Sequence, residues 1–128
     1  MNLVTEDTCT FCKNTPETIL HLLWQCEISQ DFFRELKIYI ENKCNIQINA
    51  WGVKEVIFGS SKIDKVQNLI LLQAKFYLYY NKTKGQLPSL EPFKKRVTNF
   101  YKIEKYNATK YCNLEKFEKL WDKYKNLA

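Results

Sequence analysis

Hydrophobic residues recur three and four positions apart along most of the chain, a spacing typical of helices that bury one face. The predicted helices cover residues 29–43, 51–58, 61–84, 89–112 and 113–127. Gly59 and Gly85 stand where two of them are expected to end, and Ser61 and Ser89 where two are expected to begin. The pattern therefore predicts an all-α fold built on a bundle of about four to five helices.

Each predicted helix has an apolar face that we expect to form the core. In residues 29–43 this face is Phe32, Phe33, Leu36, Tyr39 and Ile40. In residues 61–84 it is so wide that this helix is expected to be the most buried, and it comprises Val66, Leu69, Ile70, Leu72, Phe76, Tyr77 and Tyr80. The inward positions of the last two helices are Phe93, Val97, Phe100, Ile103 and Tyr111, followed by Leu114, Phe117, Leu120, Trp121, Tyr124 and Leu127. Trp51 and Phe58 are expected to seal the junction between the two halves of the chain.

Four possible metal ligands lie close together near the start of the chain. Cys9, Cys12, His21 and Cys26 form the pattern Cys-x2-Cys-x8-His-x4-Cys. Three thiolates and one imidazole are a set that binds a structural Zn²⁺ ion in a closed tetrahedron, with no open position for a substrate. We therefore predict a small zinc-stapled lobe over residues 1–30, packed as one cooperative unit on a helical domain over residues 31–128.

A short helix is expected to present the second ligand pair. Thr15 is a suitable N-cap, Pro16 suits the first helical position, and Glu17 lies near the positive end of the helix dipole. His21 and Cys26 are five residues apart, which is about 140° around a regular α-helix. A regular helix cannot direct both side chains at one ion, so we expect the helix to tighten or end at Cys26.

Other uses of the cysteines remain open at this level. Cys9 and Cys12 have the spacing of a redox pair, although such pairs usually accompany an α/β pattern that is missing here. Disulfide bonding is a second alternative, but the five cysteines are odd in number and follow no secretory segment. Cys44 and Cys112 are interpreted as small core residues. The composition suits an intracellular protein of the cytoplasm or nucleus, without a membrane-spanning segment.

Charge is distributed unevenly along the chain. Residues 1–61 contain five basic and eight acidic side chains, whereas residues 62–128 contain fifteen and six, giving net charges of −3 and +9. A basic half rich in lysine favours sequence-independent contact with the phosphates of RNA or DNA. The candidate contact residues are Lys75, Lys82, Lys84, Lys94, Lys95, Arg96, Lys102 and Lys105, with Tyr79 and Tyr101 as possible stacking partners for unpaired bases.

Several segments resemble one known family. Glu17-Thr18-x-x-His21-Leu22-Leu23-x-x-Cys26, together with Cys9 and Cys12, is similar to the zinc-binding segment that follows the reverse transcriptase domain in LINE-type (non-LTR) retrotransposon polyproteins. The segments Val56–Gly59, Asn68–Tyr80 and Pro88–Phe93 resemble the helical tail of the same polyproteins. The resemblance covers nearly the whole chain, which is then a fragment of such a polyprotein or a separate reading frame.

The resemblance implies an accessory domain that binds the element's RNA or its target DNA during reverse transcription, with structural Zn²⁺ on the four ligands. The chain contains no polymerase or nuclease motif, no glycine-rich phosphate loop and no second histidine to act as a base, so we do not expect it to be an enzyme. The alternative function is a zinc-stabilised interaction module that docks onto the polymerase body or another protein.

Overall fold

The computed structural model describes residues 8–14, 16–48, 51–59 and 63–127, whose regular structure is helical. The elements are the π-helical turn η1 (His21–Gln25), the helices α2 (Glu27–Cys44), α3 (Val53–Phe58), α4 (Lys65–Lys84), α5 (Leu90–Lys110) and α6 (Leu114–Trp121), and the 3-10 helix η2 (Asp122–Leu127). Within these ranges the sole β feature is an isolated bridge between Thr8 and Pro16. The predicted all-α class is confirmed. Each predicted helix has a counterpart among the described residues, and the one predicted over 113–127 is divided between α6 and η2.

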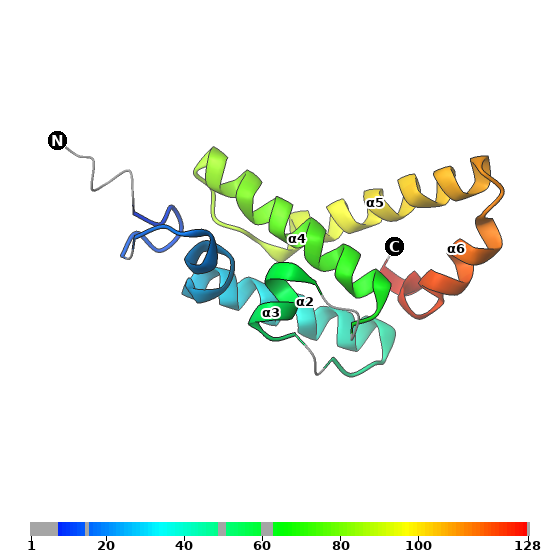
Figure 1. Ribbon diagram of the computed structural model, residues 1–128, viewed down its shortest axis with the longest axis horizontal. Helices are drawn as coiled ribbons and strands as arrows, with labels where there is room; N and C mark the ends of the chain where they lie inside the picture. The colour runs from blue at the N-terminus through cyan, green and yellow to red at the C-terminus, as the bar shows by residue number, and fades with distance from the viewer. Residues whose placement is uncertain (1–7, 15, 49–50, 60–62, 128) are drawn as a thin grey trace.

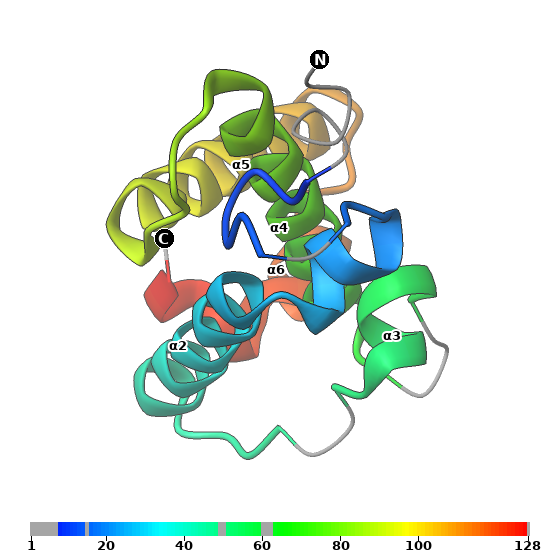
Figure 2. The same ribbon diagram turned by 90° about the vertical axis from the view of Figure 1, so that its left-hand side faces the viewer.

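The helices form a body with the small N-terminal lobe at one end (Figure 1). The turn η1 packs against α2, α3 and α4, so the lobe adjoins three helices of the body. Figure 2 shows η1 between α2 and α3, with α4 behind it. At the other end α6 folds back from α5, and η2 continues it onto α2. The last residues of the chain therefore close the bundle beside a helix from its first half.

The centre of the core is a group of aromatic rings from three helices. Phe32 of α2, Tyr77 of α4 and Phe93 of α5 have ring centroids 5.4–5.5 Å apart, which is typical of stabilising aromatic pairs. Phe93 is completely buried. The predicted face of α2 is correct, because Phe32, Phe33, Leu36 and Ile40 are buried and Tyr39 is half-buried.

The predicted faces of α4 and α5 are only partly correct. Val66, Ile70 and Tyr77 are buried as predicted, together with Leu71, Ala74 and Leu78. Leu72, Phe76 and Tyr80 are exposed, because only one side of α4 lies on the body. Ile103 and Tyr111 are also exposed, because the buried residues of α5, Phe93 and Val97, are confined to its first half.

The junction before α4 also differs from the prediction. Phe58 is 83% exposed and does not seal it, whereas Trp51 is half-buried and donates from Nε1 to Gln67 Oε1 at 2.9 Å. The N-cap of α4 is Asp64, whose side chain accepts from Val66 N–H, and Ser61 lies outside the described residues. Gly59 and Gly85 follow α3 and α4 as predicted, with φ angles of 75° and 66° that favour glycine.

Polar contacts join the C-terminal end to α4. Tyr124 is 1% exposed, and its hydroxyl donates to Asp64 Oδ2 at 3.0 Å and accepts from Gln67 Nε2 at 3.0 Å. Burial, together with the neighbouring Asp64 carboxylate, raises the pKa of Tyr124 to about 12. The hydroxyl therefore remains protonated and keeps its donor role. This network attaches η2 to the start of α4.

Candidate metal centre

The first ligand pair lies in a tight turn. Lys13 N–H donates to the Cys9 carbonyl at 2.9 Å, and Lys13 has a φ of 60°, so the backbone reverses immediately after Cys12. Phe11, between the two cysteines, is 5% exposed and belongs to the core. The turn thus directs both sulfur atoms to one side while its phenyl ring holds it against the body.

The second ligand pair is presented by a widened helical turn. The Cys26 N–H donates to the His21 carbonyl at 2.7 Å, an i→i+5 bond of the π-helical type, and the backbone then becomes extended at Cys26. The helix ends at Cys26 as predicted, but its last turn is wider than a regular α-helical turn, not tighter. Five residues fill this wider turn, so His21 and Cys26 reach the same side.

The start of this turn differs from the prediction. The His21 N–H donates to the Thr18 hydroxyl at 3.0 Å, so Thr18 supplies the capping oxygen. Pro16 pairs with Thr8 before the helix begins, and Thr15 lies outside the described residues. Ser29, at the start of α2, donates from its buried hydroxyl to the Leu22 carbonyl, which attaches η1 to α2. This Ser29 contact could not be predicted from the pattern of residues.

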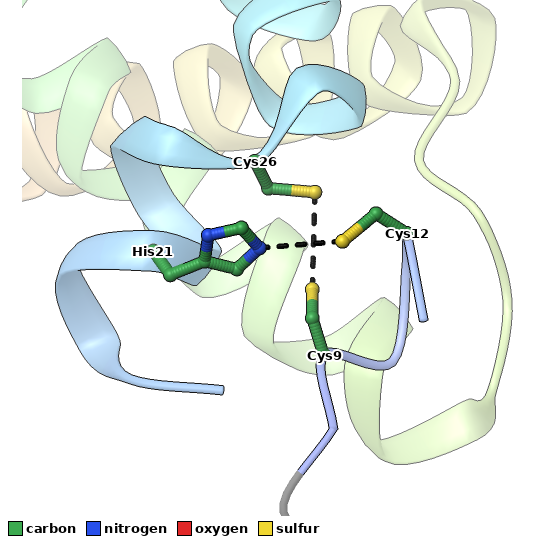
Figure 3. Close-up of side chains that lie close together, drawn as sticks. All are labelled: Cys9, Cys12, His21 and Cys26. Carbon is green, nitrogen blue, oxygen red and sulfur yellow. Dashed lines mark hydrogen bonds between the residues drawn. The ribbon is translucent and has the colours of Figure 1, made fainter. Parts of the chain in front are cut away.

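The four predicted ligands converge on one point (Figure 3). Their donor atoms all lie within 4.8 Å of one another, with Cys9 Sγ to Cys26 Sγ at 3.8 Å and Cys12 Sγ to His21 Nε2 at 3.3 Å. In Figure 3 the two lines that join these pairs cross, as opposite edges of a tetrahedron do. Tetrahedral Zn²⁺ with Zn–S bonds of about 2.3 Å and Zn–N bonds of about 2.0 Å requires separations of about 3.5–3.8 Å. The cluster is therefore consistent with a zinc site.

Burial separates the cluster from solvent on most sides. Cys9 and Cys26 are fully buried, His21 is 6% exposed and Cys12 is half-buried. A hydrogen bond from the Asn14 backbone, with further bonds from His21 and the other cysteines, outweighs burial and lowers the pKa of Cys12 to about 6. Burial raises the pKa of Cys26 to about 11. Because ligand thiols bind as thiolates, a divalent cation bound here would compensate the cost of ionising Cys26.

The alternative uses of the cysteines find less support in the geometry. All five cysteines lie within the described ranges and none is in a disulfide, and the 3.8 Å between the Cys9 and Cys26 sulfurs is far longer than an S–S bond. Cys44 is half-buried against the core, in line with the prediction. Cys112 is exposed, contrary to the prediction, because it occupies the turn between α5 and α6 with a φ of 60°.

Glu17 connects the first ligand turn to the helical body. One of its oxygens accepts from the Thr10 N–H at 2.9 Å and from the Thr10 hydroxyl at 3.0 Å, and the other is 3.0 Å from Lys82 Nζ in the last turn of α4. Burial raises the pKa of Glu17, but the Thr10 and Lys82 contacts outweigh it, so the pKa is lowered overall. The sequence suggested a role at the helix dipole, whereas the observed role is to hold the turn between Cys9 and Cys12.

We expect Glu17→Ala to reduce the stability of the zinc-loaded protein by about 1–3 kcal/mol, because the Thr10 N–H and hydroxyl lose a charged acceptor. Glu17→Gln is expected to have a smaller effect, since it keeps an acceptor. Urea unfolding measures the stability, and competition with a chelator measures the zinc affinity. Glu115→Ala is the matched control, because the Glu115–Lys119 pair is exposed and its loss is expected to cost less than about 0.5 kcal/mol. Equal losses in Glu17→Ala and Glu115→Ala would contradict the assigned role.

The candidate nucleic-acid residues differ in their exposure and in their contacts with other side chains. Lys75 Nζ donates to the Ile57 carbonyl at 2.7 Å, Lys82 pairs with Glu17, and Lys94 pairs with Glu91 and lies 4.6 Å from the centre of the Tyr39 ring. Arg96 is half-buried against the rings of Tyr77 and Tyr80. The remaining lysines are exposed, namely Lys84, Lys95, Lys102 and Lys105, and Lys84 Nζ lies 5.7 Å from the centre of the Tyr80 ring.

The two candidate stacking residues also differ. Tyr79 is 58% exposed, with Lys82 Nζ 5.5 Å from its ring centre. Tyr101 is half-buried and packs on Phe117 and Trp121, with ring centroids 5.3 and 5.2 Å away. Tyr79 is therefore the more accessible ring.

Comparisons of the chain with protein-family models, with curated proteins and with solved structures find no match. Among the described residues, no helix has both the length and the apolar character needed to cross a lipid bilayer.

Proposed function

We propose that the chain is a zinc-stabilised domain that binds RNA or single-stranded DNA mainly through phosphates. The convergence of Cys9, Cys12, His21 and Cys26 supports the structural metal, because four protein donors complete a tetrahedron and leave no open position for catalysis. On this basis the metal folds the N-terminal lobe and takes no part in a reaction.

The proposed phosphate contacts lie on α5. This helix carries six basic and two acidic side chains, and Lys95, Lys102, Lys105 and Lys110 are all exposed. Lysine neutralises phosphates as a point charge without requiring one fixed geometry, which favours binding that does not depend on sequence. The exposed lysines of α5 are the observation that best supports the nucleic-acid part of the proposal.

The biological setting that we propose follows the resemblance to LINE-type retrotransposon polyproteins. In that setting the domain accompanies a reverse transcriptase and holds the RNA template or the DNA target. The spacing of the four ligands and the Glu17-Thr18-x-x-His21-Leu22 segment support this proposal.

The affinity for a single-stranded RNA of mixed sequence is expected to fall steeply as salt rises, because lysine–phosphate contacts release counterions. Replacing Lys95, Lys102 and Lys105 together by Gln is expected to reduce the slope of log K against log[salt] by about 2, at about 0.7 per phosphate contact on a single strand. Titrations at several salt concentrations measure the slope. The control is Lys43→Gln with Lys54→Gln, which removes two exposed lysines from the other half of the chain. A slope unchanged by the triple substitution would contradict the α5 surface.

A second function is supported by the exposed side of α4. Leu72, Phe76 and Tyr79 are 41%, 56% and 58% exposed and follow each other at helical spacing, which is unusual for a surface with no partner. The whole of α4 contains four lysines and no acidic residue. Its best complement is an amphipathic helix with acidic flanks on a partner protein. Absent or salt-insensitive RNA binding in the same titrations would favour this second function.

A further inference from the structure

A pocket lies where the metal lobe meets the body. It has a volume of about 370 Å³ and opens between η1, α2 and α3. Two half-buried indole rings, those of Trp24 and Trp51, line it together with the buried Phe33 and Val56. Its polar lining comes from α2, in the form of Gln30, Arg34 and Lys37. None of the described side chains that line it is acidic.

These lining groups are suited to a flat aromatic ligand that carries a negative charge. Indole rings bind planar π systems by stacking, and this type of contact is tolerant of the identity of the base. Arg34 and Lys37 are three residues apart on α2, so they lie on the same side of the helix and both reach the pocket. The side-chain amide of Gln30 provides both donors and an acceptor for a ring edge.

The charged and aromatic groups are arranged so that a ligand can use them. Trp51 Nε1 donates to Gln67 Oε1, which fixes the orientation of this indole before any ligand binds. Arg34 is paired with Asp31, but both side chains are more than 60% exposed. An ion pair this exposed contributes little to the stability of the fold, so a phosphate can replace Asp31 as the partner of Arg34.

We propose that this pocket holds one unstacked nucleobase of a single-stranded nucleic acid, while Arg34 and Lys37 contact the adjoining phosphate. The inference rests on the proposed function and adds to it a part of the affinity that the nucleobase provides. A base within a duplex is stacked on its neighbours and cannot enter, so the pocket selects single strands. Trp24 lies between the ligands His21 and Cys26, so one wall of the pocket folds together with the metal site.

The test compares two oligomers of equal length on the zinc-loaded full chain. One is a single-stranded oligodeoxyadenylate, and the other is its abasic counterpart with the same phosphates. The base-bearing oligomer is expected to bind between about five-fold and about a hundred-fold more tightly, which is the gain in affinity that stacking of one base on an aromatic side chain provides. It is also expected to quench tryptophan fluorescence more than the abasic one, because Trp24 and Trp51 line the pocket while Trp121 is 2% exposed in the core.

Substitutions show which side chains provide the part of the affinity that depends on the base. Trp24→Ala is expected to reduce the affinity ratio of the two oligomers to near one. Tyr79→Ala tests the competing stacking residue on α4. Phe58→Ala, which removes an 83% exposed ring that belongs to no proposed binding surface, is the control expected to leave the ratio unchanged. Zinc content and circular dichroism check the fold of each variant. Lys37→Met provides a second variant on a half-buried side chain, and it is expected to weaken both oligomers more than Lys43→Met does, six residues further along α2.

Each outcome of this experiment has a definite meaning. Equal binding of the two oligomers by the unmodified protein would overturn the pocket while leaving phosphate-led binding intact. A ratio that is lost in Tyr79→Ala and kept in Trp24→Ala would also overturn it. Binding of neither oligomer would overturn the proposed function itself.

Discussion

Removing the metal is expected to unfold the segment from Cys9 to Cys26 and to leave α2, α4 and α5 helical. Cys9 and Cys26 are fully buried, and the donor atoms of Cys9, Cys12, His21 and Cys26 all lie within 4.8 Å of one another, so we expect the fold of this segment to depend on the ion that they would share. In zinc-finger peptides structural Zn²⁺ contributes about 10–16 kcal/mol of apparent binding free energy, and most of it stabilises the fold. The rings of Phe32, Tyr77 and Phe93 lie outside the ligand segment and form their contacts without the metal.

The measurement is hydrogen exchange followed by peptide mass spectrometry, with and without a chelator. Amides of η1 are expected to lose protection on chelation and in Cys12→Ser, and those of α4 are expected to keep it. Cys112→Ser is the matched control, because this cysteine is exposed in the turn after α5. Metal analysis is expected to find one zinc ion per chain. A protein purified without chelator that contains no zinc, or a Cys12→Ser variant with normal protection, would refute the metal centre.

The clustering of Cys9, Cys12, His21 and Cys26 was predictable from the sequence because the chemistry of the four residues is specific and their spacing is short. The way in which they meet was harder to predict. The 140° between His21 and Cys26 showed that a regular helix cannot direct both side chains at one ion. A helix that tightens, ends or widens at this point can do so. The structure widens the turn, with the His21 carbonyl bonded to the Cys26 N–H, and Thr18 supplies its cap. The choice depends on contacts with α2, α3 and α4 that local sequence does not contain.

The burial of α4 shows that the spacing of apolar residues does not always predict which side of a helix is buried. Apolar residues occur around most of this helix, so the pattern alone could not indicate which side meets the body. Leu71 and Leu78 turned inward, while Leu72 and Phe76 remained exposed. Glu17 illustrates the same limitation for polar residues. Its partner Lys82 is distant in the sequence, and only the folded chain brings the two together.

Phe93→Ala is expected to lower the free energy of unfolding by about 3–5 kcal/mol. Phe93 is 0% exposed, and its ring contacts Phe32 and Tyr77, so truncation removes buried apolar area and leaves a cavity between three helices. Urea unfolding of the zinc-loaded protein measures the effect as a lower midpoint with an unchanged slope.

Two phenylalanines of the same chain are matched controls for this substitution. Phe58 and Phe76 are 83% and 56% exposed, and their replacement by Ala is expected to change stability by less than about 0.5 kcal/mol. Similar losses at Phe76 and Phe93 would mean that the outer side of α4 is covered in solution. The α4 surface would then be an interface already occupied, and the core would extend beyond the three rings at its centre. A large loss at Phe93 alone places the core between α2, α4 and α5 and leaves the outer side of α4 available to a partner.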